Sequence, residues 1–252
     1  MPEDALLSLI LAFVVSAAAG WVDAIAGGGG MLTVPFLLNL GLPPSLALGT
    51  NKFQSSFGSL AASWRFSRAG ELRRGTALYG ASFTLCGAFA GAWLVQRINA
   101  AFLGYLMPFL LAAILLYVML APDFGGSERG PRVAEKKLLC ALGLLLGFYD
   151  GFFGPGTGTL WAAGLVLWGG LGLLKATGYT KVMNFTSNIA ALAFFMLGGN
   201  VSYAIGCVMA IGQFLGGRLG ASMAVRKGTA FVRPVFLGAS AVLTAVLFYR
   251  MF

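Results

Sequence analysis

The sequence contains no histidine, and only 10% of its 252 residues are charged. Without histidine the chain lacks the commonest metal ligand, the usual proton shuttle and the base of a Ser-His or Cys-His hydrolase. A soluble domain carries about a quarter charged residues. Because 58% of the residues are hydrophobic and the mean hydropathy is +0.85, the solvent of this chain must be largely lipid.

Cysteine is scarce as well. Cys86, Cys140 and Cys207 lie inside apolar stretches and form no CxxC pair, so we expect neither disulfides nor a thiolate metal site. No Gly-x-x-x-x-Gly-Lys-Ser/Thr motif occurs, which argues against ATP as the energy source, and no cofactor is predicted. The net charge is +9, but basic residues do not alternate with aromatic ones as on a nucleic-acid surface, so nucleic acid is not an expected partner.

Ten apolar segments that could form helices follow one another along the chain. They cover 5–22, 31–42, 45–63, 76–96 and 101–120, then 138–153, 158–173, 176–198, 202–217 and 231–250. The two sets match in number, order and length. We therefore expect an all-α polytopic membrane protein, with a first transmembrane repeat over 1–122, a cytoplasmic linker over 123–137 and a second repeat over 138–252.

The residues repeat as well as the segments. WVDAIAG at 21–27 parallels FYDGFFG at 148–154, which aligns Asp23 with Asp150. Ala47, Gly49, Lys52, Ala61 and Ala62 recur 129 residues later as Ala176, Gly178, Lys181, Ala190 and Ala191. Gly87, Phe89 and Gly91 recur as Gly212, Phe214 and Gly216, and Pro108 as Pro234. Four such blocks in one order predict that the halves are copies of one unit.

Basic residues indicate how the two copies are oriented. Loops 65–74, 121–137 and 218–233 hold twelve of the seventeen Lys and Arg residues, which assigns these loops to the cytoplasm. Loop 65–74 is basic while its counterpart at 198–202 is neutral, and 96–101 is nearly neutral while its counterpart at 218–233 is basic. The halves should therefore be inverted, with both termini outside, and a substrate site near the midplane.

Segment 31–42 leaves one ambiguity. As a helix it would measure about 18 Å, which is short for a hydrocarbon core of about 30 Å. With 45–63 it could form a re-entrant hairpin, or it could cross fully with help from the glycines before it. Lys175 at the tip of the second hairpin, against Pro43 and Pro44 at the first, slightly favours full crossings.

Four charged residues lie within apolar segments: Asp23, Lys52, Asp150 and Lys181. Each costs about 2.5–3.5 kcal/mol at a helix centre, so each needs a partner or a water-filled cavity. Ion pairs that only satisfy themselves are one explanation. The repeat-related positions favour a shared site instead. Burial would favour protonated aspartates suited to proton coupling, whereas pairing with lysine would make them counter-ions.

Both lysines stand in polar helix centres. We expect the substrate to be bound by Lys52, Lys181, Thr50, Asn51, Ser55, Asn184, Ser187 and Asn188. Such hydroxyls and amides would be costly in lipid unless they lined a cavity. Together with an ammonium group they form a coordination set for a small oxyanion, although interhelical hydrogen bonding is an alternative.

A glycine-rich loop follows each aspartate. The glycines are Gly27, Gly28, Gly29 and Gly30 in the first half and Gly154, Gly156 and Gly158 in the second. Glycine permits unwound backbone, and a helix that begins after it presents free N–H groups to an anion. Close helix packing alone would also account for these glycines.

The motifs resemble those of the TauE/SafE family of sulfite-exporter-like permeases, in particular its branch described as probable membrane transporters. The resemblance rests on DAIAGGGGMLTVP at 23–35, ALGTNK at 47–52, GFYDGFFGPGTG at 147–158, and Lys181 with segment 184–188. It spans essentially the whole chain. It implies a multi-pass inner-membrane permease, generally an exporter, for sulfur oxyanions or organosulfonates such as sulfite or sulfoacetate.

We therefore predict a secondary transporter of a small anion that is surrounded by membrane lipids, with Asp23 and Asp150 as coupling or counter-ion groups. Coupled protons and a homo-oligomer are both compatible with this prediction. A passive anion channel is the alternative. An intramembrane enzyme is disfavoured by the missing histidine.

Overall fold

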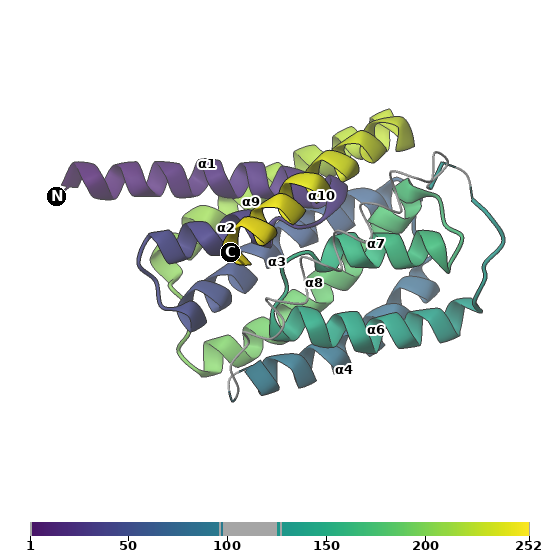
Figure 1. Cartoon of the computed structure of the whole chain (residues 1–252), viewed down its shortest axis with the longest axis horizontal. Coiled ribbons are helices and arrows are strands. Elements are labelled where there is room, and N and C mark those ends of the chain that lie inside the picture. Colours follow the sequence, from purple (N-terminus) through teal and green to yellow (C-terminus); the bar gives the residue numbers. More distant parts are fainter. Residues whose placement is uncertain (1, 96, 98–124, 127, 252) are drawn as a thin grey trace.

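The computed structural model describes residues 2–95, 97, 125–126 and 128–251, and the regular elements among them are all α-helices (Figure 1). The helices are α1 Pro2–Ala26, α2 Gly30–Asn39, α3 Pro44–Arg68, α4 Arg74–Val95, α6 Glu135–Phe152, α7 Thr157–Leu167, α8 Leu173–Leu197, α9 Tyr203–Lys227 and α10 Thr229–Met251. The predicted all-α fold is confirmed. The segment expected at 101–120 lies outside the described residues, as do residues 123, 124 and 127 of the linker predicted over 123–137.

Three of the described helices are long and apolar enough to cross a membrane by length and composition. They are residues Leu6–Ala26 of α1, and the whole of α4 and α9. Helices α3 and α8 are equally long, with 25 residues each, but their buried faces carry many polar side chains. A long helix with a polar buried face needs a polar interior to pack against. We therefore expect α3 and α8 to border the polar interior of the bundle.

Helices α2 and α7 are only half as long as a membrane span. Their ten and eleven residues correspond to about 15 and 17 Å, against a hydrocarbon core of about 30 Å. The N–H of Arg132, just before α6, donates to the carbonyl of Trp168, just after α7, so α7 returns along α6. Leu37 of α2 likewise packs against Ala12 of α1. The slight preference for full crossings was wrong.

The directions of the packed helices relate the two halves. Helix α1 lies parallel to α9, with Phe13 near Gly212 and Trp21 near Gly220. Helix α4 lies parallel to α6 in the same way, while α3 and α8 pack antiparallel at the centre. Figure 1 shows α1 and α6, the predicted equivalents, running in opposite directions. Helix α1 thus packs on α9, the predicted equivalent of α4, and α6 packs on α4 itself. Two inverted copies would pack in this reciprocal way, and we keep duplication as our interpretation.

Glycine brings the paired helices into backbone contact. A Cβ atom on Gly216 of α9 would overlap the carbonyl oxygen of Ala17 on α1, and one on Gly91 of α4 would overlap that of Phe148 on α6. Any side chain at these positions would push the two helices apart. Close approach over small residues is a common way for helices to associate in lipid, where no hydrophobic effect draws them together.

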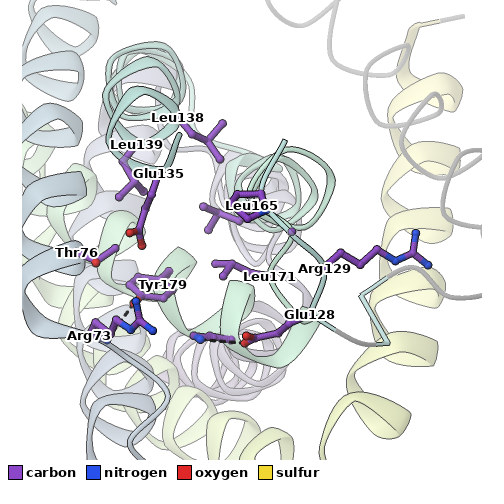
Figure 2. A pocket seen from close by; sticks show the side chains of 14 residues that line it. Arg73, Thr76, Glu128, Arg129, Glu135, Leu138, Leu139, Leu165, Leu171 and Tyr179 are labelled. Atoms are coloured by element: carbon purple, nitrogen blue, oxygen red, sulfur yellow. Dashed lines mark hydrogen bonds and ion pairs between the residues drawn. The ribbon is translucent and has the colours of Figure 1, made fainter. Parts of the chain in front are cut away.

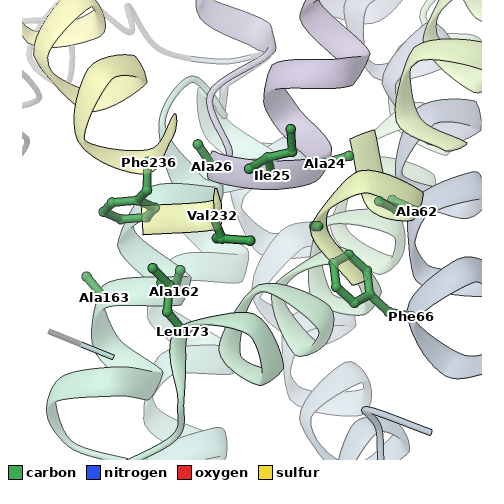
Figure 3. Packing of buried hydrophobic residues seen from close by; sticks show 12 residues of the cluster. Ala24, Ile25, Ala26, Ala62, Phe66, Ala162, Ala163, Leu173, Val232 and Phe236 are labelled. Atoms are coloured by element: carbon green, nitrogen blue, oxygen red, sulfur yellow. The ribbon is translucent and has the colours of Figure 1, made fainter. Parts of the chain in front are cut away.

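An apolar cluster fixes the end of α1 beside five other helices (Figure 3). Ala24, Ile25 and Ala26 of α1 pack there with Phe66 of α3 and Phe236 of α10, all of them at most 2% exposed. Members from α7, α8 and α9 complete the cluster. Because Asp23 directly precedes these residues, the cluster determines where its carboxylate lies.

Several basic residues that were assigned to loops lie in helices instead. Arg65 and Arg68 form part of the last turn of α3, and Arg218 and Arg226 belong to α9. Helix α6 already begins at Glu135, inside the predicted linker. The loop boundaries predicted from hydropathy were wrong because these helices continue past their apolar residues into polar sequence. Hydropathy does not identify such polar sequence as helical.

Candidate functional site

The four intramembrane charges meet as two ion pairs, and each pair joins the two halves. Lys52 on α3 donates to Asp150 near the end of α6, with Nζ 2.7 Å from Oδ1 and 2.5 Å from the backbone carbonyl oxygen. Lys181 on α8 donates to Asp23 near the end of α1, with Nζ 3.1 Å from Oδ2 and 2.5 Å from the carbonyl oxygen. Each half therefore supplies the lysine for the other half's aspartate.

Each lysine also caps the helix that carries its partner. Asp23 and Asp150 stand in the last turns of α1 and α6, where the carbonyl oxygens form the negative end of the helix dipole and the dipole disfavours a carboxylate. An ammonium group that contacts both the carboxylate and a carbonyl oxygen compensates both effects. The four charges thus form ion pairs, which is one of the two explanations that the sequence left open, and the pairs do not by themselves exclude a ligand.

The glycine loops after α1 and α6 adopt backbone conformations that favour glycine. Gly27 and Gly28 have φ of 82° and 92°, and Gly154 and Gly156 have φ of 97° and 83°. Space is short as well, since a Cβ atom on Gly154 would lie 2.8 Å from Lys52 Nζ. These turns lead directly into α2 and α7, and they supply acceptors for several of the first N–H groups, such as the carbonyl of Gly28 for Met31 and that of Gly154 for Thr157.

A small polar cavity of about 30 Å³ lies between the glycine loops and the centres of α3 and α8. It is lined by Asp23, Gly28, Gly30, Asn51, Lys52, Ser55, Asp150, Gly154, Thr157, Gly158, Asn184 and Asn188. A volume of this size holds a water molecule or an ion of similar dimensions. Residues from both halves line the cavity, as the repeat predicted.

Most, but not all, of the predicted binding residues reach this cavity. Three of the predicted residues stand outside its lining. Lys181 is fully buried against Asp23, and Ser187 donates its hydroxyl to Asp150 Oδ2. Thr50 accepts a hydrogen bond from the N–H of Ser202 at 2.9 Å, because its side chain faces α9. Of the predicted glycines, Gly27, Gly29 and Gly156 shape the loops without lining the cavity.

Two asparagines present polar groups at the cavity wall. Asn51 Oδ1 accepts from Thr33 Oγ1 at 2.6 Å and from Gln54 Nε2 at 2.9 Å, so the amide nitrogen remains for the cavity. Asn184 Oδ1 is buried without a hydrogen-bond partner in the described part of the chain. Such an orphaned atom beside a cavity indicates room for a ligand or water.

The sequence did not point to Thr33, Gln54 or Thr157. Thr33 and Gln54 orient Asn51, while Thr157 opens α7 and lines the cavity. Thr157 carries the clearest signal of the three, because a hydroxyl residue directly after a glycine turn marks a helix start.

A larger hollow of about 200 Å³ lies away from the ion pairs, at the ends of α4, α6, α7 and α8 (Figure 2). Leucines such as Leu138 and Leu165 form its floor, and charged side chains of both signs form its rim. At the rim Lys175 pairs with Glu128 at 2.9 Å. Mixed and partly exposed charges do not select an anion, so the smaller cavity remains the candidate site despite its size.

Comparison with known proteins gives a consistent result. A family model described as "Sulfite exporter TauE/SafE" matches residues 12–247. A "Probable membrane transporter protein" of Haemophilus influenzae is 41% identical over 241 residues, which cover 96% of this chain and 94% of that protein. "Probable membrane transporter protein YfcA" of Escherichia coli K12 is 41% identical over 243 residues, covering 96% and 90%. "Probable membrane transporter protein YdhB" of Bacillus subtilis is 24% identical over 242 residues, covering 92% and 98%.

Proposed function

The chain belongs to the sulfite exporter TauE/SafE family, and on that premise we propose that this membrane transporter is a secondary transporter that exports a small anion across the cell inner membrane. The family is one of transporters, so the chain is not an enzyme. As substrate we propose a sulfur oxyanion or organosulfonate, such as sulfite or sulfoacetate. We keep both termini on the outer side, as the distribution of basic residues predicts.

The observation that carries the proposal is the polar cavity between the two ion pairs. The amides of Asn51 and Asn188 line it, and the N-terminal ends of α2 and α7 border it at Gly30 and Thr157. Helix N-termini and neutral donors are typical partners of an oxyanion at the midplane of an inverted-repeat transporter.

Within this class the balance of charge favours an anion with a single charge, such as hydrogen sulfite, over a dianion such as sulfoacetate. Two lysines face two aspartates, so the ion pairs cancel formally and leave no unpaired lysine for the substrate. An anion would then be held by hydrogen bonds and by the partial positive charge of two helix ends. A second full charge on the substrate would have no cation of its own, and its desolvation would be costly.

Transport by purified protein in liposomes tests the mechanism. The assay follows the efflux of sulfite and sulfoacetate, with sulfate and acetate as comparison anions, across a range of concentrations and imposed proton gradients. A carrier gives flux that saturates, and proton coupling makes the flux respond to the gradient. Flux that follows the membrane potential without saturating would support the alternative, a passive anion channel.

Variants on α8 test the site. Asn188→Leu keeps the size of the side chain but removes its hydrogen-bonding amide, so we expect at least a roughly tenfold loss of apparent affinity. Thr186→Val is the matched control, because Thr186 lies outside the cavity lining and donates to its own helix at Val182, 2.9 Å away. If Asn188→Leu transports like the control, the assignment of this cavity to the substrate is wrong.

A further inference from the structure

A second hollow lies on the outer surface of the bundle between α3 and α9, and three arginines converge on it. Its volume is about 80 Å³, and it is lined by Ala61, Trp64, Arg65, Arg68, Phe214 and Arg218. Arg65 and Arg68 come from the last turn of α3, and Arg218 comes from α9. Neither the ion pairs nor the glycine loops contribute to this hollow, so it is separate from the transport site.

The charge of the hollow is positive. No acidic residue lines it, and the three salt bridges found among the described residues do not involve its arginines. The guanidinium group of Arg68 lies over the ring of Trp64, 4.7 Å from the ring centroid. Guanidinium groups bind phosphate through paired N–H donors, so three of them around one hollow predict an anionic ligand.

Simpler explanations cover only part of this arrangement. Basic residues at the end of α3 compensate the helix dipole, which accounts for Arg65 and Arg68. Arg218 stands well before the end of α9 at Lys227, so the dipole does not account for it. A preference for basic residues on the cytoplasmic side explains their number but not why they meet at one hollow.

Exposed apolar side chains lead along the two helices to the arginines. Helices α3 and α9 run parallel, and Phe57, Leu60 and Trp64 follow one another on one face of α3 with exposed fractions of 39%, 40% and 53%. On α9, Ile211 is 58% exposed and shares its face with Phe214 and Arg218. Exposed apolar side chains of a membrane protein contact acyl chains, and tryptophan and arginine mark the level of the headgroups.

From this geometry we propose that the hollow binds the phosphate headgroup of an anionic phospholipid, whose acyl chains lie along the exposed apolar side chains of α3 and α9. A lipid fits better than a free phosphate or other soluble anion, because the walls of the hollow continue as apolar surface that only an acyl chain would cover. The site would anchor the transporter to anionic lipid of one leaflet.

The test uses the full-length protein purified in a neutral detergent. Phosphatidylglycerol, phosphatidylcholine, glycerol phosphate and inorganic phosphate are titrated separately, and bound lipid is counted by native mass spectrometry. The test variant is Arg65→Gln/Arg68→Gln/Arg218→Gln. The control, Arg74→Gln/Arg132→Gln/Arg226→Gln, removes the same charge from residues outside the hollow. An unchanged unfolding temperature without lipid shows that each variant is folded.

We expect the test variant to bind phosphatidylglycerol more weakly by on the order of a hundredfold, since each basic residue near a membrane surface contributes about fivefold. The control should bind it within about threefold of the unmodified protein. Equal losses in both variants, no loss in the test variant, or equal binding of phosphatidylcholine would overturn the proposal. So would displacement of the lipid by inorganic phosphate alone, which would assign the hollow to a soluble anion.

Discussion

The two central ion pairs are built alike but differ in their surroundings. In both, a lysine binds the backbone carbonyl and the carboxylate of an aspartate from the other half. The side chains of Lys52 and Asp150 are 2% and 6% exposed, whereas those of Lys181 and Asp23 are 0% and 22% exposed. Asp150 accepts a further hydrogen bond from the hydroxyl of Ser187. Asp23 accepts instead from the backbone N–H of Gly29 at 3.2 Å.

The difference follows from side chains that the halves do not share. The position of Ser187 corresponds to Gly58 in the first half, where a Cβ atom would overlap Gln213 Oε1. Gln213 in turn corresponds to Ala88. The first half thus has glycine and alanine at these two positions, where the second half has serine and glutamine, so Asp23 has no hydroxyl partner of this kind. We expect Asp150 to be a fixed counter-ion and Asp23 to be the carboxylate that rearranges when a ligand binds.

Removal of one lysine at a time should produce the largest effect and should separate the two pairs. Lys52→Met leaves Asp150 buried without a cation, which should lower the free energy of unfolding by about 3–5 kcal/mol. Lys181→Met should cost less, because water can reach Asp23 at 22% exposure. Thermal unfolding of the purified variants in one detergent gives the comparison. Equal losses in the two variants would contradict the proposed difference between the pairs.

The double variant Lys52→Met/Asp150→Leu sharpens this result. Replacement of both partners of a buried ion pair by apolar side chains is often close to neutral for stability. We therefore expect the double variant to unfold close to the temperature of the unmodified protein while its transport is lost. A stable double variant that still transports would show that this pair serves only the fold.

A smaller effect is expected from Ser187→Ala, which makes Asp150 more like Asp23. The loss of a hydrogen bond to a charged group should reduce stability by about 1.5–3 kcal/mol. Ser63→Ala is the control, since Ser63 is a buried serine whose hydroxyl donates only to carbonyls of its own helix. If both variants lose the same stability, the hydroxyl on Asp150 is not what distinguishes the two pairs.

The sequence predicted the convergence of the charges but not their pairing. Lys52 and Lys181 have equivalent positions, and so do Asp23 and Asp150, so spacing alone does not decide whether partners come from the same half or from opposite halves. The pairing depends on how α3 and α8 pack across the ends of α6 and α1. That packing is a tertiary property, which a pattern of polar residues along one helix does not contain.

Two other features escaped the sequence for related reasons. Thr50 precedes Asn51 and Lys52 in a polar run, but a helix turns by about 100° per residue, so its hydroxyl faces α9. The half-length of α7 was hidden because residues 168–173 are nearly as apolar as the helix before them. Hydropathy indicates contact with an apolar environment. A short helix inside a bundle has such contact just as a membrane-spanning helix does, so hydropathy does not distinguish the two.

The smallest effect should come from the exposed ion pair between Lys175 and Glu128. Its atoms are 2.9 Å apart, as close as those of the central pairs, but the side chains are 24% and 57% exposed. Water already solvates both charges, so Lys175→Met should change the free energy of unfolding by only about 0–1 kcal/mol, and high salt should reduce even this change. The measurement is thermal unfolding of this variant beside Lys52→Met at low and high salt. If the loss matched that of Lys52→Met, distance rather than burial would govern these pairs, and the contrast between Asp150 and Asp23 would lose its physical basis.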